Sequence, residues 1–286
     1  FSPSPAYGYV SAGCGYRLGR LMGASGPLSF YDWYCDLPAG EPETWGAQTE
    51  ECEEWDWVNS RLLILWGANV AESRMAATHF VTEAKYQGCK VVSILSDYNA
   101  TSKIADAAIC PLRGTDGALA LGLVREIIVH NWHDPEYIRT FTDLPFLIRK
   151  DNQAFLREKD MAEGGSAYRL YVWDTKSGAP ALAPGTMGDD RDSLDWEPFG
   201  IRPALDFSGT VRLVTGEEVK VETAWCRLQR MLDAEYTLDQ VADTTQVNAK
   251  VIADLAREIG TRRPVSIIEG GGINHWYHND LNNRAM

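Results

Sequence analysis

Three short apolar runs lie along residues 61–129, and helical spacing follows each of them. The first run, RLLILW, is continuously apolar, which is typical of a parallel strand buried on both faces. Strands that alternate with helices pair in parallel through right-handed crossovers. We therefore predict an α/β fold built as a doubly wound, nucleotide-binding parallel sheet. The expected strands are 61–66, 89–95 and 108–111, and the expected helices are 75–87, 102–107 and 117–129.

Residues 151–222 depart from this pattern and form an irregular, β-containing excursion rich in Gly, Pro and Asp. One expected strand covers 169–173, and TGEE at 215–218 predicts a hairpin between 211–214 and 219–221. After the excursion we expect helices at 223–234 and 237–259, the latter broken near Thr244, and then a strand at 265–268 that runs into GGG at 270–272. Residues 5–24 are rich in small residues and predict a close-packed helix.

Composition limits the possible functions. The 286 residues suit one large or two ordinary domains, and 45% hydrophobic with 23% charged residues indicates a globular core. A net charge of −13 argues against a nucleic-acid partner. We find no apolar run of about 20 residues that could span a membrane, and no signal segment. The chain starts at Phe1 and ends inside an expected helix, so we expect a fragment.

Several common catalytic and metal motifs are missing from the sequence. The six cysteines form no CxxC pair, which argues against a zinc ribbon or a local iron–sulfur motif. HExxH, P-loop and GxSxG motifs are also absent, which argues against zinc protease, ATPase and hydrolase activities.

The loops after four expected strands are the candidate binding site, because ligands of open α/β sheets bind beyond the carboxyl ends of the strands. Glycines there allow close backbone approach, and helix N-termini offer N–H groups to phosphate. Asp97 is placed to accept hydrogen bonds from ribose hydroxyls. Asp116 either accepts from a purine or caps a helix. The candidate cofactor-binding residues are Trp66, Gly67, Asn69, Asp97, Gly114, Thr115, Asp116, Gly271, Gly272 and Asn274.

Two histidine pairs have the i, i+3 spacing that can chelate a metal. His130 and His133 lie at the end of an expected helix, where we interpret them as structural. His275, the first residue of the HWYH stretch, follows the glycine-rich turn on the ligand side of the sheet. It is the better functional candidate.

The stretch SFYDWYCDLP, residues 29–38, places a thiol and a carboxylate side by side at Cys35 and Asp36. Both are possible metal ligands, and four neighbouring aromatic residues could exclude water. By itself the stretch is explained more simply as an aromatic loop that closes onto a core.

Taken in order, these motifs resemble the catalytic subunit of nitrate reductases and nitrite oxidoreductases, which are molybdenum enzymes of the dimethyl sulfoxide reductase superfamily. The resemblance covers nearly all of the chain except about 151–222. It rests on SFYDWYCDLP, TWG, WGANVAESR, HFVTEAKYQG, SDYNATSKIAD, GTDGALAL, FTDLPFL and GGGINHWYHND.

The resemblance implies a specific cofactor and reaction. Molybdenum would be held by two molybdopterin guanine dinucleotides, with Asp36 as the protein ligand and Cys35 beside it unligated. His275 would line the substrate pocket. The implied activity is oxygen-atom transfer that interconverts nitrite and nitrate, with electrons passed through iron–sulfur clusters whose ligands are not in this chain. The strand-end loops would hold guanine dinucleotide.

The resemblance also implies a domain plan and partners. Residues 1–55 and 236–286 would belong to one discontinuous domain, with 56–235 inserted as a Rossmann-like domain, all part of a larger multidomain fold. An iron–sulfur electron-transfer subunit is the expected partner, with a haem or membrane-anchor subunit as a further one.

Localisation and substrate stay open at the level of sequence. The excursion is closer to the exported branch of the superfamily, which favours the periplasmic side of a membrane, with the cytoplasmic face as the alternative. Chlorate, perchlorate or selenate are alternative substrates. A non-redox nucleotide-binding module is the alternative of a different class, although it leaves SFYDWYCDLP and NHWYH unexplained.

Overall fold

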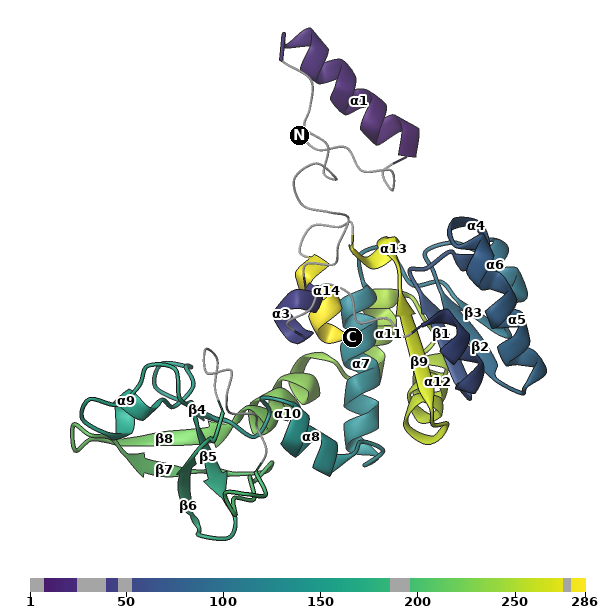
Figure 1. Ribbon diagram of the computed structural model, residues 1–286. Coiled ribbons are helices and arrows are strands. Elements are labelled where there is room, and N and C mark those ends of the chain that lie inside the picture. Colours follow the sequence, from purple (N-terminus) through teal and green to yellow (C-terminus); the bar gives the residue numbers. More distant parts are fainter. Residues whose placement is uncertain (1–7, 25–39, 46–52, 186–195, 275–278) are drawn as a thin grey trace. The chain divides into compact units, whose positions relative to one another are not determined.

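A four-stranded parallel sheet, in the order β3–β2–β1–β9, forms the centre of the first compact unit in this computed structural model (Figure 1). The structure describes residues 8–24, 40–45, 53–185, 196–274 and 279–286. The central strand β1 pairs with β2 on one side and with β9 on the other, and β2 pairs with β3. The strands are β1 (Leu62–Trp66), β2 (Lys90–Ile94), β3 (Ala107–Ile109) and β9 (Val265–Glu269).

Helices cover both faces of this sheet, as Figure 1 shows. One face carries α7 (Asp116–Val129), α11 (Leu238–Thr245) and α12 (Ala249–Thr261). The other carries η2 (Glu54–Asn59), α4 (Val70–Ser73), η3 (Met75–Ala77), α5 (Thr78–Tyr86) and α6 (Ala100–Ile104). The unit also contains α1 (Gly8–Leu21), α3 (Gly40–Trp45), α13 (Gly271–Asn274) and α14 (Asn279–Ala285).

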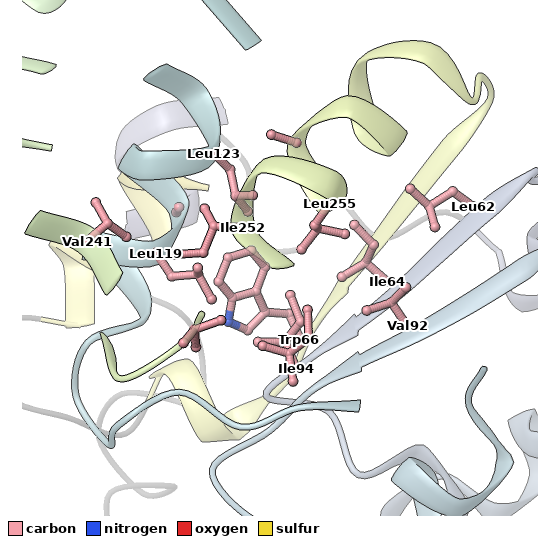
Figure 2. Packing of buried hydrophobic residues seen from close by; sticks show 14 of the residues in the cluster. Leu62, Ile64, Trp66, Val92, Ile94, Leu119, Leu123, Val241, Ile252 and Leu255 are labelled. Carbon is pink, nitrogen blue, oxygen red and sulfur yellow. The ribbon is translucent and has the colours of Figure 1, made fainter. Parts of the chain in front are cut away.

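The apolar run of β1 supplies the core on both sides. Leu62, Ile64 and Trp66 point toward α7, α11 and α12, where Figure 2 shows them among the leucines and isoleucines of those helices. Leu63 and Leu65 point the other way, toward η2, α4 and α5. Side chains alternate between the faces of a strand, so a strand with helices on both faces must be apolar at every position.

The predicted α/β class is therefore confirmed, and most expected elements fall within two residues of their places. The helix expected at 102–107 instead starts at Ala100, because the side chain of Asn99 accepts hydrogen bonds from the backbone N–H groups of Thr101 and Ser102. In α1, Leu21 is 76% exposed, and in the described part of the chain no atom lies within 4 Å of a Cβ built at Gly19. The close packing expected for residues 5–24 is not observed among these described residues.

The second compact unit, residues 133–235, contains antiparallel sheets. One sheet has the order β4–β8–β7, and the other pairs β5 with β6. The predicted hairpin is confirmed, with Val211 opposite Val219. The elements are α8 (Pro135–Phe141), β4 (Leu147–Arg149), α9 (Glu158–Met161), β5 (Tyr171–Asp174), β6 (Ala179–Leu182), β7 (Ser208–Arg212), β8 (Glu218–Thr223) and α10 (Ala224–Glu235).

The compact units divide the chain differently from the plan that the resemblance suggested. Residues 1–132 and 236–286 group together, apart from 133–235. The reason is the pairing of β9 with β1, which runs from Leu62 opposite Val265 to Trp66 opposite Glu269. The discontinuous domain plan stays a prediction about a longer protein.

A buried carboxylate stabilises the second unit. Glu222 on β8 is 2% exposed and accepts hydrogen bonds from Arg230, at 2.7 Å from Nη1, while Lys150 Nζ lies 2.9 Å from Oε2. The hydrogen bonds from Arg230 lower the pKa of Glu222 from 4.5 to about 2, against the opposing effect of burial. A buried carboxylate held by two cations is stable only as long as both cations remain in place.

We expect Glu222→Gln to lower the free energy of unfolding by about 2–3 kcal/mol at neutral pH. Because the pKa of the folded state is lowered, the wild-type advantage is present above about pH 4.5 and is lost as the pH falls toward about 2. Denaturant unfolding across this range measures it, with Glu218→Gln on the exposed side of β8 as the control. A difference that does not change with pH would contradict the assignment.

Candidate functional site

The strand order reverses at β1, because the chain moves from β1 to β2 and β3 on one side and adds β9 on the other. All four strands are parallel, so the loops that follow them leave from one edge of the sheet. A reversal of this kind opens a crevice at the carboxyl ends of the strands, and this is where doubly wound proteins bind their ligands. The candidate cofactor-binding residues lie in these loops or at the ends of the helices and strand that flank them.

Glycines join the ends of the central strands directly to one another. Gly270 donates its backbone N–H to the carbonyl of Trp66 at 2.9 Å, and Gly272 donates to the carbonyl of Gly67 at 3.0 Å. Gly67 itself has φ +63° and donates to Ile94 at 2.8 Å. A Cβ on Gly270 would lie 2.4 Å from the carbonyl oxygen of Gly67. These glycines are therefore required for contact between the loops, in addition to any approach of a ligand.

Asn69 links the loop after β1 to the helix after β2. Its Oδ1 accepts a hydrogen bond from the hydroxyl of Thr101 at 2.7 Å, and its Nδ2 donates to Glu72 at 2.8 Å. The same hydroxyl of Thr101 accepts from the backbone N–H of Ala71 at 3.0 Å. Sequence reasoning missed Thr101, which is fully buried. The Asn99 helix cap two residues earlier was the available signal for its position.

Asp97 remains accessible at the end of β2. It is exposed, and Asn99 Nδ2 approaches its Oδ1 at 3.4 Å. A carboxylate has about four lone-pair positions, so most of its capacity to accept hydrogen bonds is open to a ligand. Its role as an acceptor for ribose hydroxyls stays a prediction.

The side chain of Asp116 is held by Trp66, which the sequence analysis had assigned to cofactor binding. It is the first residue of α7, and its Oδ1 accepts a 2.8 Å hydrogen bond from the indole N–H of Trp66. Thr115 occupies the cap position, so the helix-cap interpretation of Asp116 is wrong. Burial raises the pKa of Asp116, and the hydrogen bond from Trp66 opposes that rise.

The prediction that the side chain of Trp66 contacts the cofactor disagrees with its burial. We expected it to contact a ligand, but its side chain is 2% exposed and belongs to the core next to α7 (Figure 2). A side chain this buried has almost no surface to offer a cofactor. Its connection to the site runs through Asp116.

The remaining candidates lie at the same edge or outside the described residues. Gly114 has φ +81° with open space where a side chain would be, and the hydroxyl of Thr115 donates to the Leu112 carbonyl at 2.6 Å. Gly271 is exposed at the start of α13. Asn274 ends α13, but its side chain is outside the described part of the chain, as are Asp36 and His275.

The first histidine pair has structural contacts. His130 stacks on Trp132, with ring centroids 4.5 Å apart, and its Nε2 lies 3.6 Å from Glu126.

Among the described residues, no group of three or more His, Cys, Asp or Glu side chains is placed to hold a metal ion. No helix in the same described ranges is long and apolar enough to cross a membrane.

Two carboxylates of different exposure therefore follow strands of the sheet, Asp97 in the loop after β2 and Asp116 at the start of α7. Asp97 is open to solvent, and Asp116 is partly buried against Trp66. Carboxylates accept hydrogen bonds from hydroxyl and N–H groups. The edge is suited to a ligand that presents both kinds of donor, such as a nucleoside.

Comparisons with known proteins identify the family. A family profile described as molybdopterin oxidoreductase matches residues 5–286. The perchlorate reductase subunit alpha of Dechloromonas aromatica (strain RCB) is 38% identical over 303 residues, which cover 100% of this chain and 33% of that protein. The respiratory nitrate reductase subunit alpha of Haloferax mediterranei is 36% identical over 294 residues, which cover 100% of this chain and 30% of that protein.

A solved structure has the same fold. Acetylene hydratase from Pelobacter acetylenicus superposes with a TM-score of 0.51 at 17% identity, over 96% of this chain and 26% of that one. The chain spans about a third of the length of the curated relatives it matches.

We expect Gly270→Ala to lower the free energy of unfolding by about 1–3 kcal/mol, because a Cβ there would overlap the backbone of the neighbouring loop. Denaturant unfolding measures the loss. The matched control is Gly19→Ala in α1, where nothing lies within 4 Å. Equal effects at both positions would argue against the loop contact.

We expect Asp116→Asn to raise the free energy of unfolding of the ligand-free chain at neutral pH, because it removes a carboxylate whose burial raises its pKa. Since the folded pKa lies above 3.8, the wild type loses stability relative to the variant as the pH rises through that pKa. The free energy of unfolding of both proteins is measured below pH 3.8 and at neutral pH, which tests the sign of this change. The exposed Asp97→Asn is the control. A constant difference would contradict it.

Proposed function

This chain belongs to the molybdopterin oxidoreductase family, and on that premise we propose that it is part of the catalytic subunit of a molybdenum enzyme acting on an oxyanion. The observation that carries the proposal is the family match over residues 5–286, together with relatives that cover the whole chain. We propose nitrate and nitrite as the substrate pair. The 38% identity to a perchlorate reductase subunit supports perchlorate or chlorate as the second candidate.

The described residues fit the nucleotide part of the proposed cofactor, molybdenum bis(molybdopterin guanine dinucleotide). Asp116 is partly buried, and Trp66 is its only side-chain hydrogen-bond partner in the described part of the chain. The carboxylate has further acceptor positions, which suit the N–H groups of guanine. Asp97 is exposed and suits ribose hydroxyls, and the open space at Gly114 suits a close backbone approach. When bound, the molybdenum centre supplies two-electron oxygen-atom transfer.

Two residues outside the described ranges take the central roles in this proposal. Asp36 is the proposed protein ligand of molybdenum, because a hard carboxylate suits a high-valent metal. His275 is the proposed pocket residue, because an imidazole N–H can donate a hydrogen bond to an oxyanion. Both assignments rest on the motifs SFYDWYCDLP and NHWYH in the sequence.

The rest of the enzyme is also a proposal, since the chain spans about a third of its relatives. Electrons would pass through an iron–sulfur cluster and a partner subunit of the electron-transfer type, and a haem or membrane-anchor subunit is a further proposed partner. We propose the exported side of a membrane as the location. The direction of the reaction depends on the redox potentials of these partners.

Cofactor analysis of the native full-length protein tests the proposal. About one molybdenum and about two GMP per chain after acid hydrolysis are expected for the bis-dinucleotide site. An activity panel of nitrate, nitrite, chlorate, perchlorate and selenate then separates the substrate candidates. Nucleotide without molybdenum would instead favour the non-redox binding module, and protein that contains neither would overturn the proposal.

We expect Asp36→Ala in the full-length enzyme to lower kcat by at least about 100-fold, because the metal loses its protein ligand. Cys35→Ala is the matched control at the neighbouring position and should keep activity within about threefold of the wild type. Turnover and molybdenum content are measured on both variants. Near-normal turnover of Asp36→Ala would remove this residue from the metal.

A further inference from the structure

We propose that Trp66 is a positioning residue that orients Asp116 toward the guanine base and does not contact the ligand itself. The inference rests on the proposed function, because the guanine dinucleotide is the ligand concerned. The sequence analysis had predicted that Trp66, at the end of β1, contacts the cofactor directly. The proposed role is instead to orient Asp116.

Trp66 is the last residue of β1 and lies almost wholly inside the molecule. Its ring packs beside Leu119 of α7 and Ile94 of β2, and its exposed fraction is 2% (Figure 2). The single polar atom of the side chain, Nε1, donates to Asp116 Oδ1 at 2.8 Å. A buried indole N–H that has a partner stabilises that partner in one orientation, because both groups are held by their surroundings.

The hydrogen bond connects two elements that are 50 positions apart in sequence. Trp66 is fixed by strand pairing with β2 and β9, and Asp116 is fixed at the start of α7. The orientation of the carboxylate is thereby set by the sheet. A side chain at a helix start without such a partner would rotate freely and lose entropy when a ligand binds.

The bonds from Trp66 and from the backbone N–H of Asp116 occupy only part of the roughly four acceptor positions of the carboxylate. Within the described ranges, the carboxylate of Asp116 has Trp66 as its only side-chain partner. A carboxylate can accept from two neighbouring N–H groups of a ligand, as the edge of a guanine presents them. The indole N–H also favours the ionised carboxylate against the effect of burial, and only the ionised form is purely an acceptor.

The competing explanation is that Trp66 contributes only packing. The chain supplies a matched control for it in Trp57, which is 0% exposed and lies in the core on the other face of the sheet. In the described part of the chain, Trp57 Nε1 has no hydrogen-bond partner. Trp57→Phe and Trp66→Phe thus remove similar buried volumes, but only the second removes a hydrogen bond.

The test measures how quickly the cofactor leaves the full-length holoenzyme. Each variant is incubated, desalted at intervals and hydrolysed in acid, and the remaining GMP per chain gives the half-time of loss. We expect Trp66→Phe to shorten that half-time about tenfold and Trp57→Phe to leave it within about twofold, since a hydrogen bond to a charged group is being removed. Replacing Trp66 by benzothienylalanine, which keeps the ring shape without the N–H, covers the case in which Trp66→Phe does not fold.

Asp116→Ala separates positioning from packing. If Trp66 acts through Asp116, adding Trp66→Phe to Asp116→Ala should change the half-time by less than about twofold. A tenfold effect that persists in the Asp116→Ala background would overturn the inference, as would equal effects of the two tryptophan variants. Wild-type enzyme without GMP would overturn the proposed cofactor, and the role of Trp66 with it, whereas wild-type GMP with an inert Trp66→Phe would overturn only the inference.

Discussion

The burial of β1 on both faces and both edges is the constraint on which the first unit depends. Its five residues are all buried, and its backbone pairs with β2 on one side and β9 on the other. A buried strand has no water to satisfy its backbone groups, so two neighbours are required. The position of β9 beside β1, distant in sequence, follows from this requirement. The reversal of strand order at β1 follows in turn.

The same strand organises the loops beyond it. Gly67 and Gly270 bring the ends of β1 and β9 into backbone contact, and Asn69 joins the loop after β1 to Thr101 of α6. These bonds hold the candidate site before any ligand arrives. A preformed site costs less ordering entropy on binding, which matters for a large cofactor with many rotatable bonds. The scaffold and the site are therefore made by the same short segments.

In the proposed function, Asp116 is the residue at which stability and ligand recognition oppose each other. A partly buried carboxylate with a raised pKa is unfavourable for the folded chain, and a neutral side chain would be more stable at the same place. Features of this kind gather where a ligand must be recognised, because the ligand supplies the missing partners. Glu222 in the second unit is the opposite case. Its cations are within the protein, and its lowered pKa reflects the ion pairs with Arg230 and Lys150.

Local patterns in the sequence were sufficient for the elements and the fold class. The apolar run at 61–66, the TGEE turn and the helix break near Thr244 each depend on a few neighbouring residues, and the structure has all three. The family resemblance rested on motifs such as GGGINHWYHND, which are also contiguous. Tertiary structure alone decided that β9 completes the sheet of β1, that Thr101 holds Asn69, and that Trp66 faces the core and bonds Asp116. These contacts join residues 32 to about 200 positions apart. Periodicity in a sequence carries no information about which distant groups meet.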